Sequence, residues 1–291
     1  MQFRLIAVLC VLSLYTLVTI GYFTFKLLGG KSGNTKTLNH LEEVDDRKTL
    51  NVASIQMKML FCEPGKFQMG SPDDKTLHKV ELTQGFYLGK YEITQAQWEI
   101  VMKSNPSSFQ GARRPVESVS WNDAMVFCQK LTEIEEAAGR LDKGWAYQLP
   151  SEAQWEYACR AGTETIWSFG GDASELSHHG NYADRKSTVS WADRQNDGYQ
   201  NTAPTGFYRP NPWGFHDMHG NVWEWCRDLY GNYSTEPVKD PEGSAKGTIR
   251  TVRGGSWYNK PSFTSSSIRD GNKPAERLNA LGFRCSFQPV K

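Results

Sequence analysis

Residues 149–162 read LPSEAQWEYACRAG and predict a short helix that is buried along one side. Ser151 and Gln154 have the spacing of a capping box, in which each side chain accepts a hydrogen bond from the backbone of the other residue. Gly162 is a typical helix stop. The apolar residues between them lie at helical spacing and are expected to pack in the core: Trp155, Ala158 and Cys159.

Two more helices are expected upstream, each again beginning at a hydroxyl cap. Thr94 and Gln97 form a second capping box, and Ser120 precedes a longer apolar stripe. The two stripes contain Trp98, Val101 and Met102, then Ala124, Phe127, Cys128 and Leu131. The segments KFQMG (66–70) and HKVELTQGFYLGKYEI (78–93) alternate as strands do.

Downstream of Gly162 the chain is mostly Gly, Asn, Asp, Trp and short apolar pieces. A long irregular segment needs support besides apolar burial, and bound ions or a disulfide commonly supply it. Hydrophobic residues make up 38% of the 291-residue chain and aromatic residues 12%, which excludes wholesale disorder. The 33 Lys and Arg against 32 Asp and Glu leave a net charge of +1, so we expect no nucleic-acid partner.

The amino terminus has a different composition. Leu5 to Phe25 contains no charged residue and, at about 1.5 Å per residue, would span a bilayer core of about 30 Å as a helix. A cleaved signal peptide is the competing interpretation, but it would have a shorter apolar core and a small-residue cleavage site. We expect a transmembrane anchor over residues 1–28, a polar linker over 29–51 and one folded domain over 52–291. The protein would then be a single-pass membrane protein with an extracytoplasmic domain.

Seven segments of the domain together resemble the formylglycine-generating enzyme, or sulfatase-modifying factor, family. They are FQMGS (67–71), YEITQAQW (91–98), RPVESVSWNDAMVFC (114–128), LPSEAQWEYACRAG (149–162), NPWGFHDMHGNVWEWCRD (211–228), RGGSW (253–257) and LGFRC (281–285). The resemblance implies an α+β fold in a single loop-rich domain with little regular secondary structure, related to C-type lectins.

In the oxidase branch of this family, two cysteines shortly after the GGS motif bind copper and attack the substrate thiol. Soft thiolates suit Cu(I), whereas an amide and a hydroxyl do not. Here no cysteine lies between Ser256 and Arg284, and Asn259 and Thr264 fall near the positions of the pair. We therefore expect copper-dependent oxidation to be absent. A rearranged metal site that uses Cys62 or Cys226 is the alternative.

The rest of the family pocket is aromatic and polar in this chain. Trp223, Ser256 and Arg269 match pocket positions and join Asn259 and Thr264 as candidate site residues. Arg269 would hold a carboxylate or a peptide carbonyl, and Trp223 would form a flat wall for an extended peptide or a glycan. The alternative is a core Trp and a structural Arg.

The resemblance also implies structural calcium and a disulfide. Calcium prefers six to eight oxygen ligands, and nine positions match the family's pattern. Side-chain donors would be Asn181, Asp197, Asp217 and Glu224, and carbonyl donors would be Tyr182, Tyr199, Met218, Gly220 and Val222. Cys159 and Cys285 match two positions that are joined in some members, which would require an oxidising compartment. Turn residues without calcium and two reduced, buried cysteines are the alternatives.

Three functions follow from these observations. The first is a calcium-stabilised, membrane-anchored protein that binds peptide or glycan without oxidising it. The second is a formylglycine-generating oxidoreductase with an unidentified metal site. The third is a structural envelope component that contacts another protein.

Overall fold

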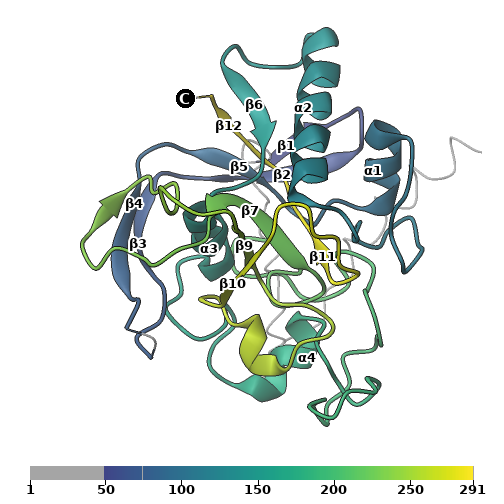
Figure 1. Ribbon diagram of the computed structural model, residues 1–291, viewed down its shortest axis with the longest axis vertical. Helices are drawn as coiled ribbons and strands as arrows, with labels where there is room; N and C mark the ends of the chain where they lie inside the picture. The colour runs from purple at the N-terminus through teal and green to yellow at the C-terminus, as the bar shows by residue number, and fades with distance from the viewer. Residues whose placement is uncertain (1–48, 74, 291) are drawn as a thin grey trace, which may run out of the picture. The chain divides into compact units, whose positions relative to one another are not determined.

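The computed structural model describes residues 49–73 and 75–290, which form three β-sheets with short helices between them (Figure 1). The largest sheet has five antiparallel strands in the order β1-β2-β5-β12-β6. The strands are β1 (Thr49–Val52), β2 (Met57–Cys62), β5 (Phe86–Gly89), β6 (Trp145–Gln148) and β12 (Ser286–Pro289). The last strand of the chain thus lies inside this sheet, between β5 and β6.

The second sheet has the order β10-β9-β7-β11 and carries two of the candidate site residues, Trp223 and Arg269. Its strands are β7 (Trp223–Leu229), β9 (Arg250–Arg253), β10 (Arg269–Asn272) and β11 (Leu281–Gly282). The third sheet has the order β3-β4-β8. Its strands are β3 (Gly65–Met69), β4 (His78–Leu82) and β8 (Val238–Lys239). The strands expected over 66–70 and within 78–93 are therefore present as β3, β4 and β5.

The three expected helices are confirmed, and each begins with a complete capping box. They are α1 (Gln95–Met102), α2 (Trp121–Ala137) and α3 (Glu152–Arg160), capped at Thr94, Ser120 and Ser151. The stop of α3 is Ala161 rather than Gly162, because Ala161 adopts the left-handed conformation with φ 49°. A fourth helix is short, α4 (Leu176–His179), as are the 3₁₀ turns η2 (Ala173–Glu175) and η3 (Pro261–Thr264).

Two main clusters of buried apolar side chains form the core. One lies where α1 and α2 pack near the five-stranded sheet (Figure 1), and in it the rings of Trp98 and Phe127 stack with centroids 5.5 Å apart. The other surrounds α3, whose Trp155 is fully buried against the second and third sheets. The expected helix stripes therefore do face the core.

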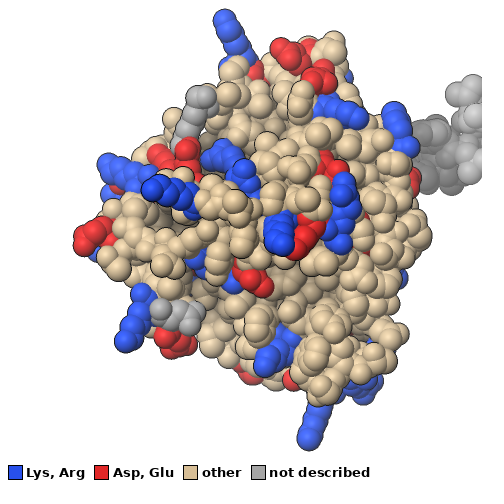
Figure 2. Space-filling model, viewed as in Figure 1, with Lys and Arg blue, Asp and Glu red and all other residues tan. Residues whose placement is uncertain are grey.

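The segment from 161 to 222 is irregular, as expected, and η2 and α4 are its only described helices. The first strand begins at Thr49 and pairs with β2, so residues 49–51 belong to the domain and not to the expected linker. Within the described ranges, no helix has both the length and the apolar character needed to cross a membrane. The anchor expected over residues 1–28 lies outside those ranges. Figure 2 shows Lys and Arg interspersed with Asp and Glu over the visible face.

Candidate functional site

A tight crossing of two loops positions the residues that follow β9. Gly255 has φ +75°, and a Cβ on it would lie 2.2 Å from the carbonyl oxygen of Phe263. Only glycine permits both this conformation and this close approach. The GGSW loop therefore crosses directly over η3, and Ser256, Asn259 and Thr264 lie around the crossing.

Three of the five predicted pocket residues meet at one amide oxygen. Trp223, the first residue of β7, donates from Nε1 to Oδ1 of Asn259 over 2.9 Å, and the Ser256 hydroxyl donates to the same oxygen over 2.6 Å. The Asn259 backbone is also fixed, because its N–H donates to the Ser256 carbonyl and its carbonyl accepts from Ala183 N–H. Asn259 is half-buried and reaches solvent.

Thr264 lies on the interior side of the crossing and is fully buried. Its hydroxyl donates to the Pro261 carbonyl over 2.8 Å and accepts from Trp167 Nε1 over 3.1 Å. Its carbonyl is 2.8 Å from Nδ1 of His219, a residue whose pKa burial lowers to about 4. Neutral His219 thus holds the backbone of η3. The Thr264 side chain is buried among protein groups, so its role is structural and it does not face a ligand.

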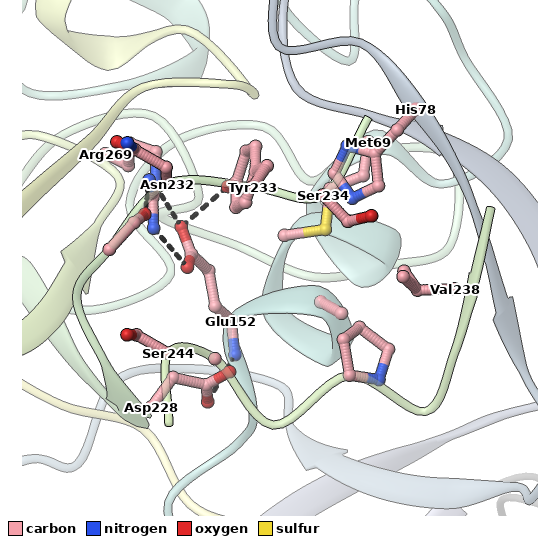
Figure 3. A pocket seen from close by; sticks show the side chains of 14 residues that line it. Met69, His78, Glu152, Asp228, Asn232, Tyr233, Ser234, Val238, Ser244 and Arg269 are labelled. Atoms are coloured by element: carbon pink, nitrogen blue, oxygen red, sulfur yellow. Dashed lines mark hydrogen bonds and ion pairs between the residues drawn. The ribbon is translucent and has the colours of Figure 1, made fainter. Parts of the chain in front are cut away.

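Arg269 has a different set of partners and lies beside Glu152 and Tyr233 (Figure 3). It contacts both oxygens of Glu152, at 2.7 and 2.8 Å, and donates to the Gly231 carbonyl. The Cζ atom of its guanidinium also lies over the rings of Tyr230 and Tyr233, 4.4 and 4.0 Å from their centroids. Because Nε, Nη1 and Nη2 all have partners within the protein, the structure favours the interpretation of a structural Arg. The adjacent cavity, of about 120 Å³, is lined by Glu152 and Tyr233 among others.

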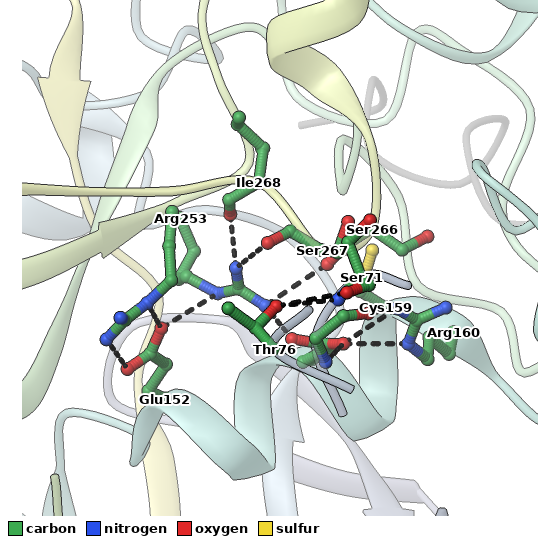
Figure 4. A network of polar contacts seen from close by, with 12 residues as sticks. Ser71, Thr76, Glu152, Cys159, Arg160, Arg253, Ser266, Ser267 and Ile268 are labelled. Carbon is green, nitrogen blue, oxygen red and sulfur yellow. Dashed lines mark hydrogen bonds and ion pairs between the residues drawn. The ribbon is translucent and has the colours of Figure 1, made fainter. Parts of the chain in front are cut away.

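A buried ion network holds the segment after Thr264 against α3 (Figure 4). Arg253, fully buried, pairs with Glu156 and donates to the carbonyls of residues 266–268. Arg160 binds the other oxygen of Glu156 over 2.8 Å. Sequence reasoning did not identify this network. Its only local signal is the pair of acidic residues, Glu152 and Glu156, four apart on a helix whose other residues predict burial.

The predicted Cys159–Cys285 disulfide is wrong. Cys159 packs in the cluster around α3 and Cys285 in the cluster under α1 and α2, so the two sulfurs lie in different parts of the core. The sulfur beside Cys285 is that of Cys128, at 3.6 Å. The described cysteines, which include Cys62 and Cys226, are all buried free thiols.

Burial also raises the pKa of several of these thiols. The pKa of Cys159 rises to about 12, and those of Cys62, Cys226 and Cys285 rise well above their ordinary range because the charged thiolate would lose its hydration. The alternative metal site at Cys62 or Cys226 would therefore need thiolates in places that disfavour them.

The expected calcium ligands include two buried oxygens that lack a partner. Oδ1 of Asn181 and Oδ1 of Asp217 make no hydrogen bond, which is costly for buried polar atoms. Burial raises the pKa of Asp217 to about 7, and a bound cation would relieve this penalty. The segment that follows Asp217 lies beside Asn181, since Asn221 N–H donates to the Asn181 carbonyl over 2.8 Å. Amide and carboxylate oxygens are ligands of the kind that Ca²⁺ prefers.

The other two expected carboxylates already have partners. Asp197 accepts from the backbone N–H groups of Tyr182 and Tyr199, both at 2.9 Å. Glu224 is held by Arg284 through two contacts of 2.6 Å and by Trp155 Nε1 at 2.8 Å. Among the residues that the structure describes, no three acidic, His or Cys side chains are grouped closely enough to hold a metal by themselves. A calcium site would therefore depend on backbone carbonyls.

Glu92 is a buried carboxylate near this region that sequence reasoning missed. It accepts from Asn221 Nδ2 over 2.7 Å and from Val222 N–H over 3.2 Å. Burial, together with the charges of Asp217 and Glu224, raises its pKa. It lies in YEITQAQW, just ahead of the capping box of α1, where no spacing pattern marks it as a site residue.

Comparison with known proteins identifies the family. A family model described as the sulfatase-modifying factor enzyme 1-like domain matches residues 47–288, and the chain belongs to this family. The formylglycine-generating enzyme of Mus musculus is 32% identical over 201 residues, which cover 67% of this chain and 50% of that protein. The chaperone protein LppX of Paenibacillus barcinonensis is 33% identical and matches 59% of this chain and 69% of that protein.

Solved structures agree with this assignment. Treponema denticola variable protein 1 matches with a TM-score of 0.72 at 29% identity, over 83% of this chain and 99% of that chain. The described domain is therefore the mixed α and β domain that the resemblance implied. The chain spans about half the length of the mouse relative, at 50% of it, so the activity of that whole protein does not transfer with the family.

Proposed function

We propose that this domain binds a peptide segment of another protein at the amide of Asn259 and does not oxidise cysteine to formylglycine. The observation that carries the proposal is that no cysteine lies between Ser256 and Arg284, where Asn259 and Thr264 fall near the expected positions of the thiol pair. Neither side chain suits Cu(I), and neither can form a mixed disulfide with a substrate. The relative from Paenibacillus barcinonensis is named a chaperone protein, which agrees with polypeptide binding.

The experiment uses an acetyl-Ala-Cys-Ala-Pro-Ala-Arg-amide peptide, which carries the Cys-x-Pro-x-Arg pattern. We expect the protein to bind this peptide and leave its mass unchanged, with or without Cu(I) and oxygen. A formylglycine-generating enzyme assayed in parallel is the positive control. Formation of formylglycine by the wild-type chain would overturn the proposal and redirect attention to the buried cysteines.

The proposal has two further parts, calcium and location. The orphaned oxygens of Asn181 and Asp217 support a structural Ca²⁺, which would supply charge compensation in the irregular segment. The uncharged run from Leu5 to Phe25 supports a membrane anchor that places the domain outside the cytoplasm. The full chain should then remain with the membrane fraction after a carbonate wash, and its release into the supernatant would contradict the anchor.

A further inference from the structure

The two residues that fall near the expected thiol positions differ in what they can offer a ligand. Thr264 is fully buried, and its hydroxyl both donates and accepts a hydrogen bond within the protein. A single hydroxyl has one proton to donate, so Thr264 has no donor left for a ligand. Asn259 is half-buried and therefore the one of the two that reaches solvent.

The orientation of the Asn259 amide is fixed by its neighbours. The indole Nε1 of Trp223 can only donate, so the atom facing it at 2.9 Å must be the amide oxygen. The same oxygen also accepts from the Ser256 hydroxyl. The Nδ2 group must then point away from both, and within the described residues no hydrogen bond engages it.

Tyr258, the chain neighbour of Asn259, belongs to an exposed aromatic pair. The rings of Trp191 and Tyr258 meet edge to face with centroids 5.3 Å apart, and 45% and 43% of these residues are exposed. Trp191 Nε1 donates to the Tyr258 carbonyl, so the exposed pair is fixed beside Asn259 in the chain. The neighbouring cation, Lys260, lies over the ring of Phe263. The Nδ2 group of Asn259 is an uncharged donor, which suits an uncharged acceptor such as a peptide carbonyl.

We infer that Asn259 recognises a backbone carbonyl of the bound peptide, to which its Nδ2 donates a hydrogen bond, while Trp223 and Ser256 hold the amide in that orientation. This inference rests on the proposed function, since it assigns the contact made at the same site. It makes Asn259 a ligand-binding residue in place of a catalytic thiol.

The test compares isosteric changes at the two positions. Asn259→Asp keeps an oxygen for Trp223 and Ser256 but replaces the Nδ2 donor by a second acceptor. Fluorescence anisotropy with the labelled hexapeptide should show at least a tenfold loss of affinity at pH 7.5, because a donor is lost and two acceptors then face each other. Thr264→Val, which changes only internal contacts, should bind the peptide like the wild type even if it melts earlier.

The pH dependence separates recognition from folding. Protonation of the introduced carboxyl restores an O–H donor, so Asn259→Asp should regain affinity relative to the wild type between pH 7.5 and 3.5. Asn259→Ala should also lose affinity, because the donor is lost, and should regain none as the pH falls. Equal binding by wild type and Asn259→Asp at pH 7.5 would overturn this inference alone. Absence of binding by the wild type, or binding of chitotriose in place of the peptide, would overturn the proposed function together with it.

Discussion

Asp228 shows how one buried carboxyl links the second sheet to a helix. It lies on β7 and accepts from the N–H of Glu152, the first residue of α3, over 2.9 Å. Burial, and then the negative charge of Glu152, raise its pKa to about 7. In the unfolded chain an aspartate titrates near 3.9. The folded domain therefore binds a proton here that the unfolded chain has released.

This difference predicts a pH-dependent stability. Because the folded pKa is the higher one, the stabilisation is complete below about pH 4 and is lost as the pH rises through about 7. Asp228→Asn keeps an acceptor for Glu152 N–H but cannot titrate. Its thermal midpoint should therefore fall less between pH 5 and pH 8 than that of the wild type, by scanning calorimetry. The exposed Asp270→Asn is the control, and parallel profiles for the wild type and Asp228→Asn would contradict the assignment.

Individual site residues were predictable only where the signal was local. Trp223 and Ser256 could be chosen from the GNVWEW and GGSW motifs and Asn259 from its place shortly after GGSW, and the three do meet. Arg269 was chosen in the same way but binds Glu152, which is 117 residues away. No pattern of residue spacing predicts a contact between residues so far apart in the sequence. The same reason explains why Glu224 was assigned to calcium while its partner Arg284 went unnoticed.

The helices were predictable because a few adjacent residues determine where each helix begins. Capping boxes at Thr94, Ser120 and Ser151 fix where α1, α2 and α3 begin. The order of the strands was not predictable, since β12 pairs with β5 and β6 from the far end of the chain. The wrong disulfide has the same origin, because α2 and not α3 faces the segment that precedes β12.

Cys128 on α2 and Cys285 next to β12 predict how the domain responds to oxidation. Refolding in a glutathione buffer should join these two sulfurs, each thiol losing its proton while the two electrons pass to oxidised glutathione. The bond would close a loop between residues 157 apart, and it should raise the thermal midpoint by several degrees. Peptide mapping under non-reducing conditions identifies the pair.

Two single variants serve as controls for this pairing. Cys128→Ser should abolish both the cross-linked peptide and the gain in midpoint, whereas Cys159→Ser should leave them intact. A Cys159–Cys285 peptide in the wild type would contradict the arrangement of the core.

Across the whole domain, side-chain hydrogen bonds hold the irregular segment, which has little regular secondary structure. Asn221 is the central example: its Oδ1 accepts from Asn181 Nδ2 and Ala203 N–H, while its Nδ2 donates to Glu92. Its φ of 68° is left-handed, which asparagine tolerates better than most residues. One amide thus joins three segments, and the unpartnered oxygens of Asn181 and Asp217 belong to the same region.

These unpartnered oxygens predict that the domain is stabilised by calcium. An ion that binds only the folded state adds RT ln(1 + [L]/Kd), about 2.7 kcal/mol when its concentration is a hundred times Kd. Chelation should therefore lower the thermal midpoint, and added Ca²⁺ should restore it. Asp217→Ala removes both the ligand oxygen and its charge, so this variant should respond to neither treatment.

The Glu224→Gln variant tests whether Glu224 is a calcium ligand or only the ion-pair partner of Arg284. Because both oxygens of Glu224 are held by Arg284 and Trp155, this change should destabilise the domain yet leave its response to calcium. Loss of the response in Glu224→Gln alone would instead return Glu224 to the ligand set and imply that Arg284 moves away when the ion binds. A wild-type thermal midpoint that is the same in chelator and in calcium would contradict the calcium site. Buried water molecules would then be the hydrogen-bond partners of Asn181 Oδ1 and Asp217 Oδ1.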